Sequence, residues 1–446
     1  MPLGWEMSQK KTEIPGTGEL RTMVFDGRML TVASLVNSAL GAVYWFIAAR
    51  FFPAQDVGIA STTVNSALTL ATVSNLALGP VVERLVPVAG RLQLKMVTLV
   101  QAVTGCLAVV LALAFLWIGP SDQLFPGNGQ KIVFVLAVPV LARYSLQDSV
   151  LIGLRTGKLS ALRNIAHAVA KLVIIAALAT SPASTGIVLS WIIPSLVGVV
   201  VVQCALFATG GLLRRERDLP PRLPPARRII SFNLLATVWM VVQALPGLAV
   251  PVIVLRGTSE ETAAYFNLSW TVVTASTVLV TAVAGPYVSS ASRNPDQLGP
   301  LTRRFILMYL RISVLRTVMV ALGGPVLMWF YGADYARGSL ALLLLIALGQ
   351  AVSTSAYIYG NLERVNGRIG CSALLQGVGA VVLTGAAALL VPAHGLVGAG
   401  LAYLVHDIYL AVASAPRATR LIRSMRRGVL PDDRLRAQDT HRPIPR

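Results

Sequence analysis

Long apolar stretches separated by short, mostly basic segments run along nearly the whole chain. A helix needs about 20 apolar residues to cross the hydrocarbon core of a bilayer. Eight stretches of that length contain no charged side chain: 29–49, 57–82, 96–121, 181–213, 229–255, 262–292, 338–362 and 369–393. Four others are long enough but contain internal charge: 132–154, 159–180, 305–333 and 395–416. No stretch alternates in polarity as a membrane β-strand does, so the pattern predicts an all-α protein with about twelve transmembrane helices.

The composition agrees with this prediction. Of the 446 residues, 55% are hydrophobic and 13% are charged, whereas an ordinary soluble domain has about 25% charged residues. The net charge of +19 would indicate nucleic acid in a soluble protein. Here the placement of the charges fits membrane topology instead, so no nucleic-acid partner is expected. The three cysteines lie inside apolar stretches and predict neither a disulfide framework nor a metal site.

The basic residues alternate from loop to loop. With the N-terminus in the cytoplasm, 30 of the 38 Lys and Arg residues fall in cytoplasmic segments, four in outer loops and four within spans. Cytoplasmic loops of membrane proteins are enriched in Lys and Arg. The bias predicts a multi-pass protein of the cytoplasmic membrane with both termini in the cytoplasm.

The predicted layout has five parts. A cytoplasmic segment, 1–28, precedes a six-helix bundle, 29–213. A Pro- and Arg-rich cytoplasmic linker, 214–228, then leads to a second six-helix bundle, 229–416. The basic tail, 417–446, is expected to be disordered and to contact anionic membrane lipids. Because outer loops are short and no nucleotide-binding loop, metalloprotease motif or nucleophile elbow occurs, we expect neither an enzyme nor a cofactor.

An offset of 206 residues aligns landmarks of the two halves. Arg50 matches Arg256, Gly79-Pro80 matches Gly285-Pro286, and Asn37 matches Gln243. Six-span repeats inserted in the same orientation are related by an axis along the membrane normal. The offset therefore predicts two related bundles with a binding site between them.

Charged residues inside the fourth and fifth spans are the main candidates for a site. Arg143 and Lys171 each lie fourteen residues from Gly157, which places both about 20 Å from the turn at 1.5 Å per residue. Asp148 and His167 form a second layer, and Gln147 shares a helix face with Arg143. One interpretation is a basic, hydrated wall that binds an anionic group of a substrate. Another is a structural network in which Asp148 neutralises a neighbour.

Other polar residues suggest further roles. Asp148 and His167 are candidates for proton coupling. Arg316 and Asp407 lie at similar depth and suggest a structural pair between two helices. Asn37 and Gln243 are candidates for the polar wall of a substrate site, because the repeat places them at matching positions. Prolines inside spans predict kinks.

Several motifs carry a family resemblance. Residues 49–61 read Ala-Arg-Phe-Phe-Pro-Ala-Gln-Asp-Val-Gly-Ile-Ala-Ser, and residues 78–84 read Leu-Gly-Pro-Val-Val-Glu-Arg. Farther along come Thr-Ala-Ala-Tyr-Phe at 262–266 and Tyr-Gly-Ala-Asp-Tyr-Ala at 331–336. In order and spacing these segments resemble the Wzx-type polysaccharide and oligosaccharide flippases of the multidrug/oligosaccharidyl-lipid/polysaccharide exporter superfamily.

The resemblance implies two six-helix bundles around a central cavity and the flipping of a polyprenyl-diphosphate-linked oligosaccharide between leaflets by alternating access. It implies that Arg143 and Lys171 contact the diphosphate, with a polysaccharide polymerase and glycosyltransferases as partners of the pathway. The second bundle departs from the family, because its seventh, eighth, tenth and eleventh spans carry no charge. A drug or metabolite exporter of related fold, a membrane glycosyltransferase and a scaffold that acts through its basic tail are the alternatives.

Overall fold

The computed structural model describes residues 39–154, 156–178, 184–208, 223, 225–293, 297–366 and 370–426, and every regular element in these ranges is a helix. The N-terminal half, residues 39–208, begins with a helical segment, Ala39–Phe51. Its further helices are α2 (Ala54–Ser74), α3 (Leu78–Leu85), α4 (Gln93–Ile118), α5 (Ser121–Leu124), α6 (Asn128–Gly153), α7 (Gly157–Leu178) and α8 (Ser184–Phe207), with the short turns η1 (Val86–Val88) and η2 (Gly90–Leu92) before α4.

The described part of the C-terminal half, residues 225–293, 297–366 and 370–426, contains seven α-helices and one π-helical turn. They are α9 (Ala226–Gly257), α10 (Glu260–Arg293), α11 (Leu298–Val318), η5 (Met319–Gly323), α12 (Gly324–Tyr331), α13 (Ala333–Val352), α14 (Thr354–Val365) and α15 (Gly370–Arg426). Within the described ranges, eight helices are long and apolar enough to cross a membrane by themselves. Each of the twelve predicted stretches overlaps a helix, so the protein is an all-α, multi-pass membrane protein.

Interruptions divide several predicted spans. The stretch 57–82 breaks between α2 and α3, where Leu76 and Ala77 have φ of 49° and 50°. The π-helical turn η5 precedes Pro325, a residue that removes one helical hydrogen bond. Gly395, with φ 58° and ψ −133°, separates the two arms of α15 between the eleventh and twelfth predicted spans. The second arm continues to Arg426, ten residues into the range expected to form the tail.

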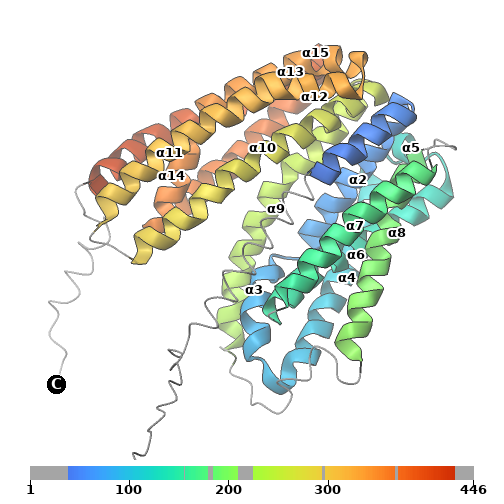
Figure 1. Ribbon diagram of the computed structural model, residues 1–446, viewed down its shortest axis with the longest axis horizontal. Coiled ribbons are helices and arrows are strands. Elements are labelled where there is room, and N and C mark those ends of the chain that lie inside the picture. The colour runs from blue at the N-terminus through green and yellow to red at the C-terminus, as the bar shows by residue number, and fades with distance from the viewer. Residues whose placement is uncertain are drawn as a thin grey trace, which may run out of the picture.

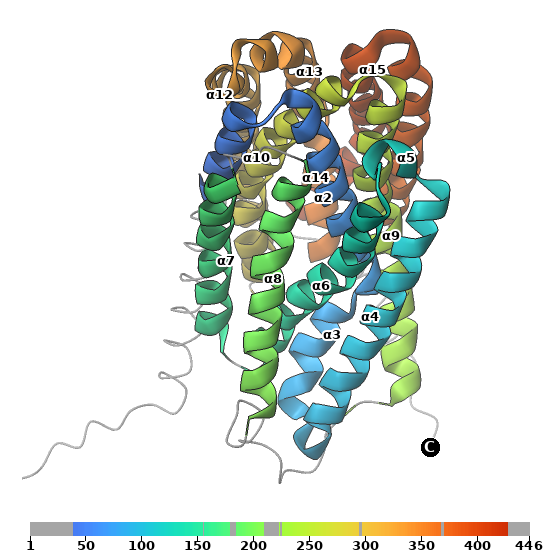
Figure 2. The same cartoon turned by 90° about the vertical axis from the view of Figure 1, so that its right-hand side faces the viewer.

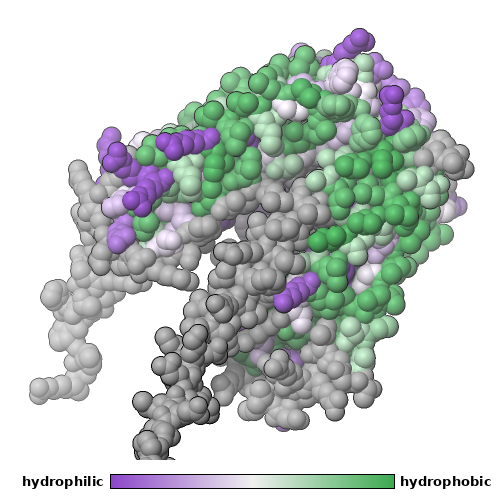
Figure 3. All heavy atoms as spheres, in the orientation of Figure 1, coloured by the Kyte–Doolittle hydropathy of each residue, from purple (hydrophilic) through white to green (hydrophobic). Residues whose placement is uncertain are grey.

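The helices run between two ends that differ in charge. The basic end carries the α3–α4 turn, the start of α7 and the start of α11, with Arg84, Arg91, Lys95, Lys158, Arg303 and Arg304. The opposite end, called the closed end below, carries α5 and the turns before α2, α10 and α13, with residues of both signs. Figure 3 shows apolar side chains covering the flanks of both halves and hydrophilic side chains gathered toward the ends.

The hydrophobic core shows how the halves are joined. One large cluster includes residues of both halves, from Tyr44 to Ile192 and from Val250 to Tyr403. A second cluster, from Val280 to Met425, belongs to the C-terminal half alone, and a third, from Val82 to Leu206, belongs to the N-terminal half alone. The last two lie toward the basic end. The halves therefore share a core at the closed end and have separate cores at the basic end. There α10 to α15 diverge from the N-terminal half, whereas α9 stays beside α3 (Figures 1 and 2).

Candidate functional site

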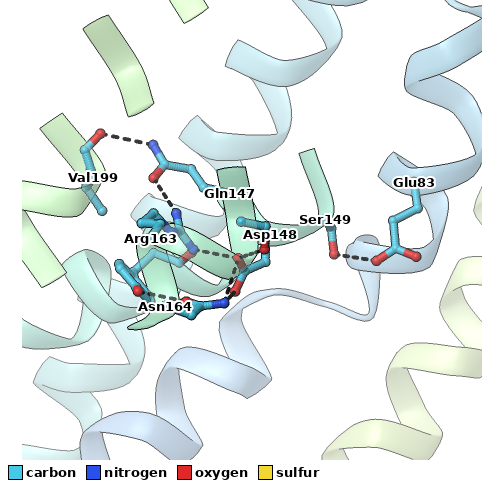
Figure 4. A network of polar contacts seen from close by, with 9 residues as sticks. Glu83, Gln147, Asp148, Ser149, Arg163, Asn164 and Val199 are labelled. Carbon is cyan, nitrogen blue, oxygen red and sulfur yellow. Dashed lines mark hydrogen bonds and ion pairs between the residues drawn. The ribbon is translucent and has the colours of Figure 1, made fainter. Parts of the chain in front are cut away.

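The turn between α6 and α7 is held together by an ion pair (Figure 4). Arg163 of α7 lies 2.8 Å from an Asp148 carboxylate oxygen of α6, and the two side chains are 7% and 29% exposed. Ser160 Oγ donates to the same carboxylate at 2.5 Å, and Asn164 Nδ2 at 3.2 Å. Asp148 is thus surrounded by donors, and the partner that neutralises it is Arg163.

Gln147 extends this network to α8. Its Oε1 accepts a hydrogen bond from Arg163 at 3.1 Å, and its Nε2 donates to the Val199 carbonyl at 3.1 Å. The Arg163 guanidinium also lies 3.9 Å from the centroid of the Tyr144 ring. A buried guanidinium needs a counter-ion and several acceptors to offset its lost hydration. This arrangement supplies them to Nη1 and Nη2, whereas Nε has no acceptor among the described residues. Asp148, Gln147 and Arg163 therefore form a charge-balanced network that joins three helices.

Lys171 lies about two helical turns beyond Arg163 on α7, in a different environment. It is 7% exposed, and its ammonium lies 3.6 Å from the centroid of the Trp191 ring and 5.5 Å from that of Tyr44. Tyr44 Oη is 2.7 Å from Ser190 Oγ, which holds the first helical segment against α8. Among the described residues no carboxylate lies within ion-pair distance of Lys171. Its ammonium contacts the faces of two aromatic rings instead.

His167 lies between Lys171 and the ion pair. Its Nε2 is 2.9 Å from Ser195 Oγ, and its ring centroid is 4.8 Å from that of Tyr144. The Ser195 hydroxyl donates its one proton to the Trp191 carbonyl at 2.8 Å, so it accepts from a His167 ring that carries its proton on Nε2.

Arg143 does not join Lys171. It lines a pocket of about 370 Å³ between α4, α6 and α8, where its neighbours are Gln101, Pro139, Leu196 and Val199. Lys171 meets α8 at Trp191 instead. The two cations have similar predicted depth but contact different faces of the N-terminal half.

Arg316 and Asp407, which the sequence predicts as a structural pair, do not contact each other directly. Arg316 Nε donates to Gln350 Oε1 at 3.0 Å, and Asp407 Oδ1 lies 3.1 Å from His406 Nδ1. No ion pair joins Arg316 to Asp407 within the described part of the chain. The Arg316 guanidinium lies 5.2 Å from the centroid of the Tyr357 ring of α14. Arg316 thus joins α11 to α13 and α14, and Asp407 of α15 lies against Gly349 of α13.

The remaining predicted wall residues are only partly placed. Gln243 Nε2 donates to Gln376 Oε1 of α15 at 2.7 Å, on an exposed face of α9. Asn37 lies outside the described residues. No group of three or more His, Cys, Asp and Glu side chains that could hold a metal occurs in the described ranges.

Equivalent residues of the two halves meet where α2 packs on α10. Asn267 Nδ2 donates to Ser61 Oγ at 3.0 Å, a pair separated by 206 residues. A Cβ added at Gly58 would be 3.1 Å from the amide nitrogen of Ala264, which is also 206 residues away. Residues meet their own equivalents only near a two-fold axis. These contacts place the axis of the predicted repeat between α2 and α10.

A pocket of about 250 Å³ lies beside this axis, between α2, α9, α10 and α15. Its polar lining comes from Asn65, Thr69 and Thr72, and its aromatic lining from Phe266, Trp270 and Tyr403. The Trp270 and Tyr403 rings are stacked with centroids 4.9 Å apart, and Asn65 Nδ2 donates to Asn267 Oδ1 at 3.0 Å. No lining residue is charged.

Sequence reasoning did not single out this central pocket. Its residues are scattered over four helices, and hydroxyl and aromatic side chains are ordinary constituents of transmembrane helices. The offset of 206 was the available signal, because it pairs Ser61 with Asn267 and so indicates the axis beside which the pocket lies.

No protein-family model matches the sequence, and no curated protein matches it. Solved structures match nearly the whole chain. An inward-facing multidrug resistance MATE family transporter of the MOP superfamily aligns with a TM-score of 0.64 at 12% identity, over 88% of this chain and 96% of its own. The lipid II flippase MurJ in an inward closed conformation gives 0.64 at 10% identity, over 89% of each chain. A MOP superfamily transporter from Pyrococcus furiosus gives 0.58 at 14% identity, over 89% of this chain and 95% of its own.

An outward-facing MATE transporter gives a lower TM-score of 0.56 at 13% identity, over 90% of this chain and 96% of its own. The inward-facing transporter therefore aligns better than the outward-facing one. This agrees with the separate cores of the two halves at the basic end. At such identities the likeness shows the fold alone. This multi-pass membrane protein has the fold of the MOP superfamily.

Proposed function

We propose that this protein is a Wzx-type flippase that moves a polyprenyl-diphosphate-linked oligosaccharide from the cytoplasmic to the outer leaflet for envelope polysaccharide synthesis. In this proposal the basic end faces the cytoplasm, as the distribution of Lys and Arg predicts. The halves rock about the contact between α2 and α10, so that the central pocket opens to one side at a time.

The observation that carries the proposal is the chemistry of the central pocket. Its amide and hydroxyl groups match the hydroxyls of a sugar, and the stacked Trp270 and Tyr403 offer faces for the apolar side of a sugar ring. An exporter of organic cations would need an acidic group in the pocket, and none lines it. Asp148, the carboxylate that the sequence indicates as a candidate for proton coupling, is already paired with Arg163.

Lys171 is the cation that we assign to the diphosphate. It is buried without a carboxylate partner in the described residues, and an uncompensated charge inside the membrane is a functional candidate. Arg143 faces the opposite flank of α6 and is left out of this assignment. Gln243 and Gln376, which bridge α9 and α15 beside the pocket, are assigned to the polar wall.

Mass spectrometry of lipids that co-purify with the protein tests the proposal. We expect a polyprenyl-diphosphate saccharide with the wild type, reduced roughly tenfold in Trp270→Ala and in Lys171→Gln, as the loss of one good contact in a binding site implies. Trp117→Ala is the matched control, because Trp117 is 88% exposed on the flank of α4. A wild-type protein that carries no such lipid and instead binds tetraphenylphosphonium would favour the exporter.

A further inference from the structure

The flank of the N-terminal half that faces away from the C-terminal half contains an unusual groove. Helix α6 packs against α2 on one side and lies between α4 and α8 on the other, and α2 in turn packs against α9 and α10. The pocket that Arg143 lines is on the α4–α8 side of α6, where Figure 2 shows α6 between the two flanking helices. It therefore opens away from the central pocket, toward the lipid.

Two polar groups in this groove have no partner. Arg143 forms no ion pair or hydrogen bond with the described residues. Gln101 is 1% exposed, and its Nε2 is a buried donor without an acceptor. An unsatisfied buried amide and an unpaired guanidinium in an apolar setting are both costly. The Arg143 guanidinium and the Gln101 Nε2 are thus both unpaired donors, an arrangement that favours an anion.

The depth of the site limits what that anion can be. Arg143 is ten residues before Gly153, the last residue of α6, and so about 15 Å from the basic end of that helix. Gln101 is eight residues after Gln93, the first residue of α4, which is about 12 Å. The headgroup phosphate of a resting phospholipid lies at the membrane surface. A carboxylate on a neighbouring transmembrane helix reaches this depth without distorting the bilayer.

The wall of the groove suits a helix. Ala102, Gly105 and Cys106 form a strip of small residues on α4, and a Cβ added at Gly105 would meet nothing within 4 Å. Small residues allow close approach of helix backbones in membranes. The rim is apolar and exposed, with Val103 at 43% and Leu196 at 46%.

We propose that this groove docks a transmembrane helix of another protein that carries an aspartate or glutamate near the middle of the bilayer, and that Arg143 and Gln101 bind its carboxylate. A second copy of this chain does not supply the carboxylate from the described spans. Asp148 is paired with Arg163, Asp407 contacts His406, and Glu363 accepts from Tyr359 and from the Ser372 amide. The proposal is independent of the transported substrate, because the groove and the central pocket share no residue.

Cys106 allows a direct test, because it is exposed and lines the groove. The full chain with Cys204→Ser and Cys371→Ser is placed in phosphatidylcholine vesicles with a Leu/Ala transmembrane peptide of about 21 residues. The peptide has a central Asp and one Cys a helical turn away, and oxidation traps a disulfide with Cys106. We expect trapping about tenfold faster than with a central Leu, the effect of one charge-assisted hydrogen bond.

Arg143→Gln should reduce trapping of the Asp peptide to the rate of the Leu peptide, whereas Arg311→Gln, which removes an exposed arginine of α11, should leave it unchanged. Gly105→Leu fills the groove without altering charge and should also abolish the difference, so the test stands even if Arg143→Gln does not fold. Equal trapping of both peptides would refute the proposal. So would displacement of the Asp peptide by phosphatidylglycerol, because the groove would then bind lipid phosphate.

Discussion

At the scale of single residues, the polar groups of the N-terminal half differ in whether their charge is compensated. Arg163 and Asp148 satisfy each other, whereas Lys171 and Arg143 have no carboxylate partner among the described residues. A paired charge contributes to stability, and an unpaired one is available to a ligand. Substitutions at the two kinds of position should therefore have opposite signatures, one on unfolding and the other on binding.

Asp148→Asn should destabilise the protein. It leaves the buried Arg163 guanidinium without a counter-ion, and for a pair in which the carboxylate is 29% exposed we expect a loss of about 2–3 kcal/mol, below the range for fully buried pairs. The double variant Asp148→Asn/Arg163→Gln should recover part of this loss, as a double-mutant cycle measures. Unfolding in detergent checks both.

Asp122→Asn is the control for this cycle. Asp122 contacts Lys131 at 3.6 Å, but its side chain is 97% exposed, and such surface pairs contribute little. If Asp122→Asn lowered the free energy of unfolding as much as Asp148→Asn does, the structural role assigned to the α6–α7 network would be wrong.

Sequence reasoning assigned Arg143 and Lys171 a common depth but could not assign the side of the bundle that each one faces. Counting residues from Gly157 gives the depth of Arg143 and Lys171, because the rise per residue is fixed. It does not give the direction of each side chain around the bundle, which depends on how α6 and α7 rotate against α4 and α8. For the same reason the pairing of Asp148 with Arg163, rather than with Arg143 or Lys171, needed the structure.

At the scale of elements, breaks in helices matter as much as the helices. Long apolar stretches predicted where helices lie, because an apolar segment in a membrane has to satisfy its own backbone. The positions of the breaks are harder to predict from the sequence. The Leu76-Ala77 break is stabilised by two hydrogen bonds to the Leu76 carbonyl, from Asn233 Nδ2 at 3.0 Å and Thr237 Oγ1 at 2.6 Å. These donors are about 160 residues away, so no local pattern reveals the break.

Gly395→Ala should destabilise the hinge between the two arms of α15. The backbone there, φ 58° and ψ −133°, is strained for a residue with a side chain, and we expect a loss of about 1–3 kcal/mol. Gly385→Ala in the same helix is the matched control. A Cβ at Gly385 meets nothing within 4 Å, so this change should be neutral or stabilising by about 0.5–1 kcal/mol. Relative to the wild type, the unfolding temperatures of the two variants should shift in opposite directions or by clearly different amounts.

At the scale of the whole molecule, closure depends on the contact between α2 and α10. Besides the shared core, Arg256 Nη2 donates to the Ile118 carbonyl at 3.2 Å and Tyr331 Oη to the Ala42 carbonyl at 3.3 Å. These bonds join the halves near the closed end. Opening that end requires all of them to break together, which makes the contact a suitable place to trap or to disturb the transport cycle.

A disulfide between positions 61 and 267 should lock the closed end. The Ser61 and Asn267 side chains point at each other, with Oγ and Nδ2 3.0 Å apart, so Ser61→Cys/Asn267→Cys places two thiols face to face in a chain whose natural cysteines are replaced by Ser. We expect oxidation to stop transport and reduction to restore it. Transport that continues in the fully oxidised protein would mean that this contact does not open during the cycle.

Gly58→Leu should have the opposite effect. A side chain at Gly58 would collide with the Glu260 backbone carbonyl, and backbone atoms cannot move aside as a flexible side chain can. We expect the equilibrium to shift toward opening at the closed end. Distances between spin labels at Gln123 and Arg337 should increase relative to the wild type, and Gly41→Leu, at a glycine with open space around its Cβ position, should leave them unchanged.

The contact between Ser61 and Asn267 has a consequence for the history of the chain. In a symmetric dimer of identical six-helix subunits, the residue on the axis would face a copy of itself, hydroxyl against hydroxyl or amide against amide. Fusion of two copies into one gene removes that identity. One copy could then supply a long donor, Asn267, and the other two short acceptors, Ser61 and Thr62. This asymmetric bond is available only to a duplicated chain whose halves have diverged, and it lies at the point where an ancestral dimer would have been least free to change.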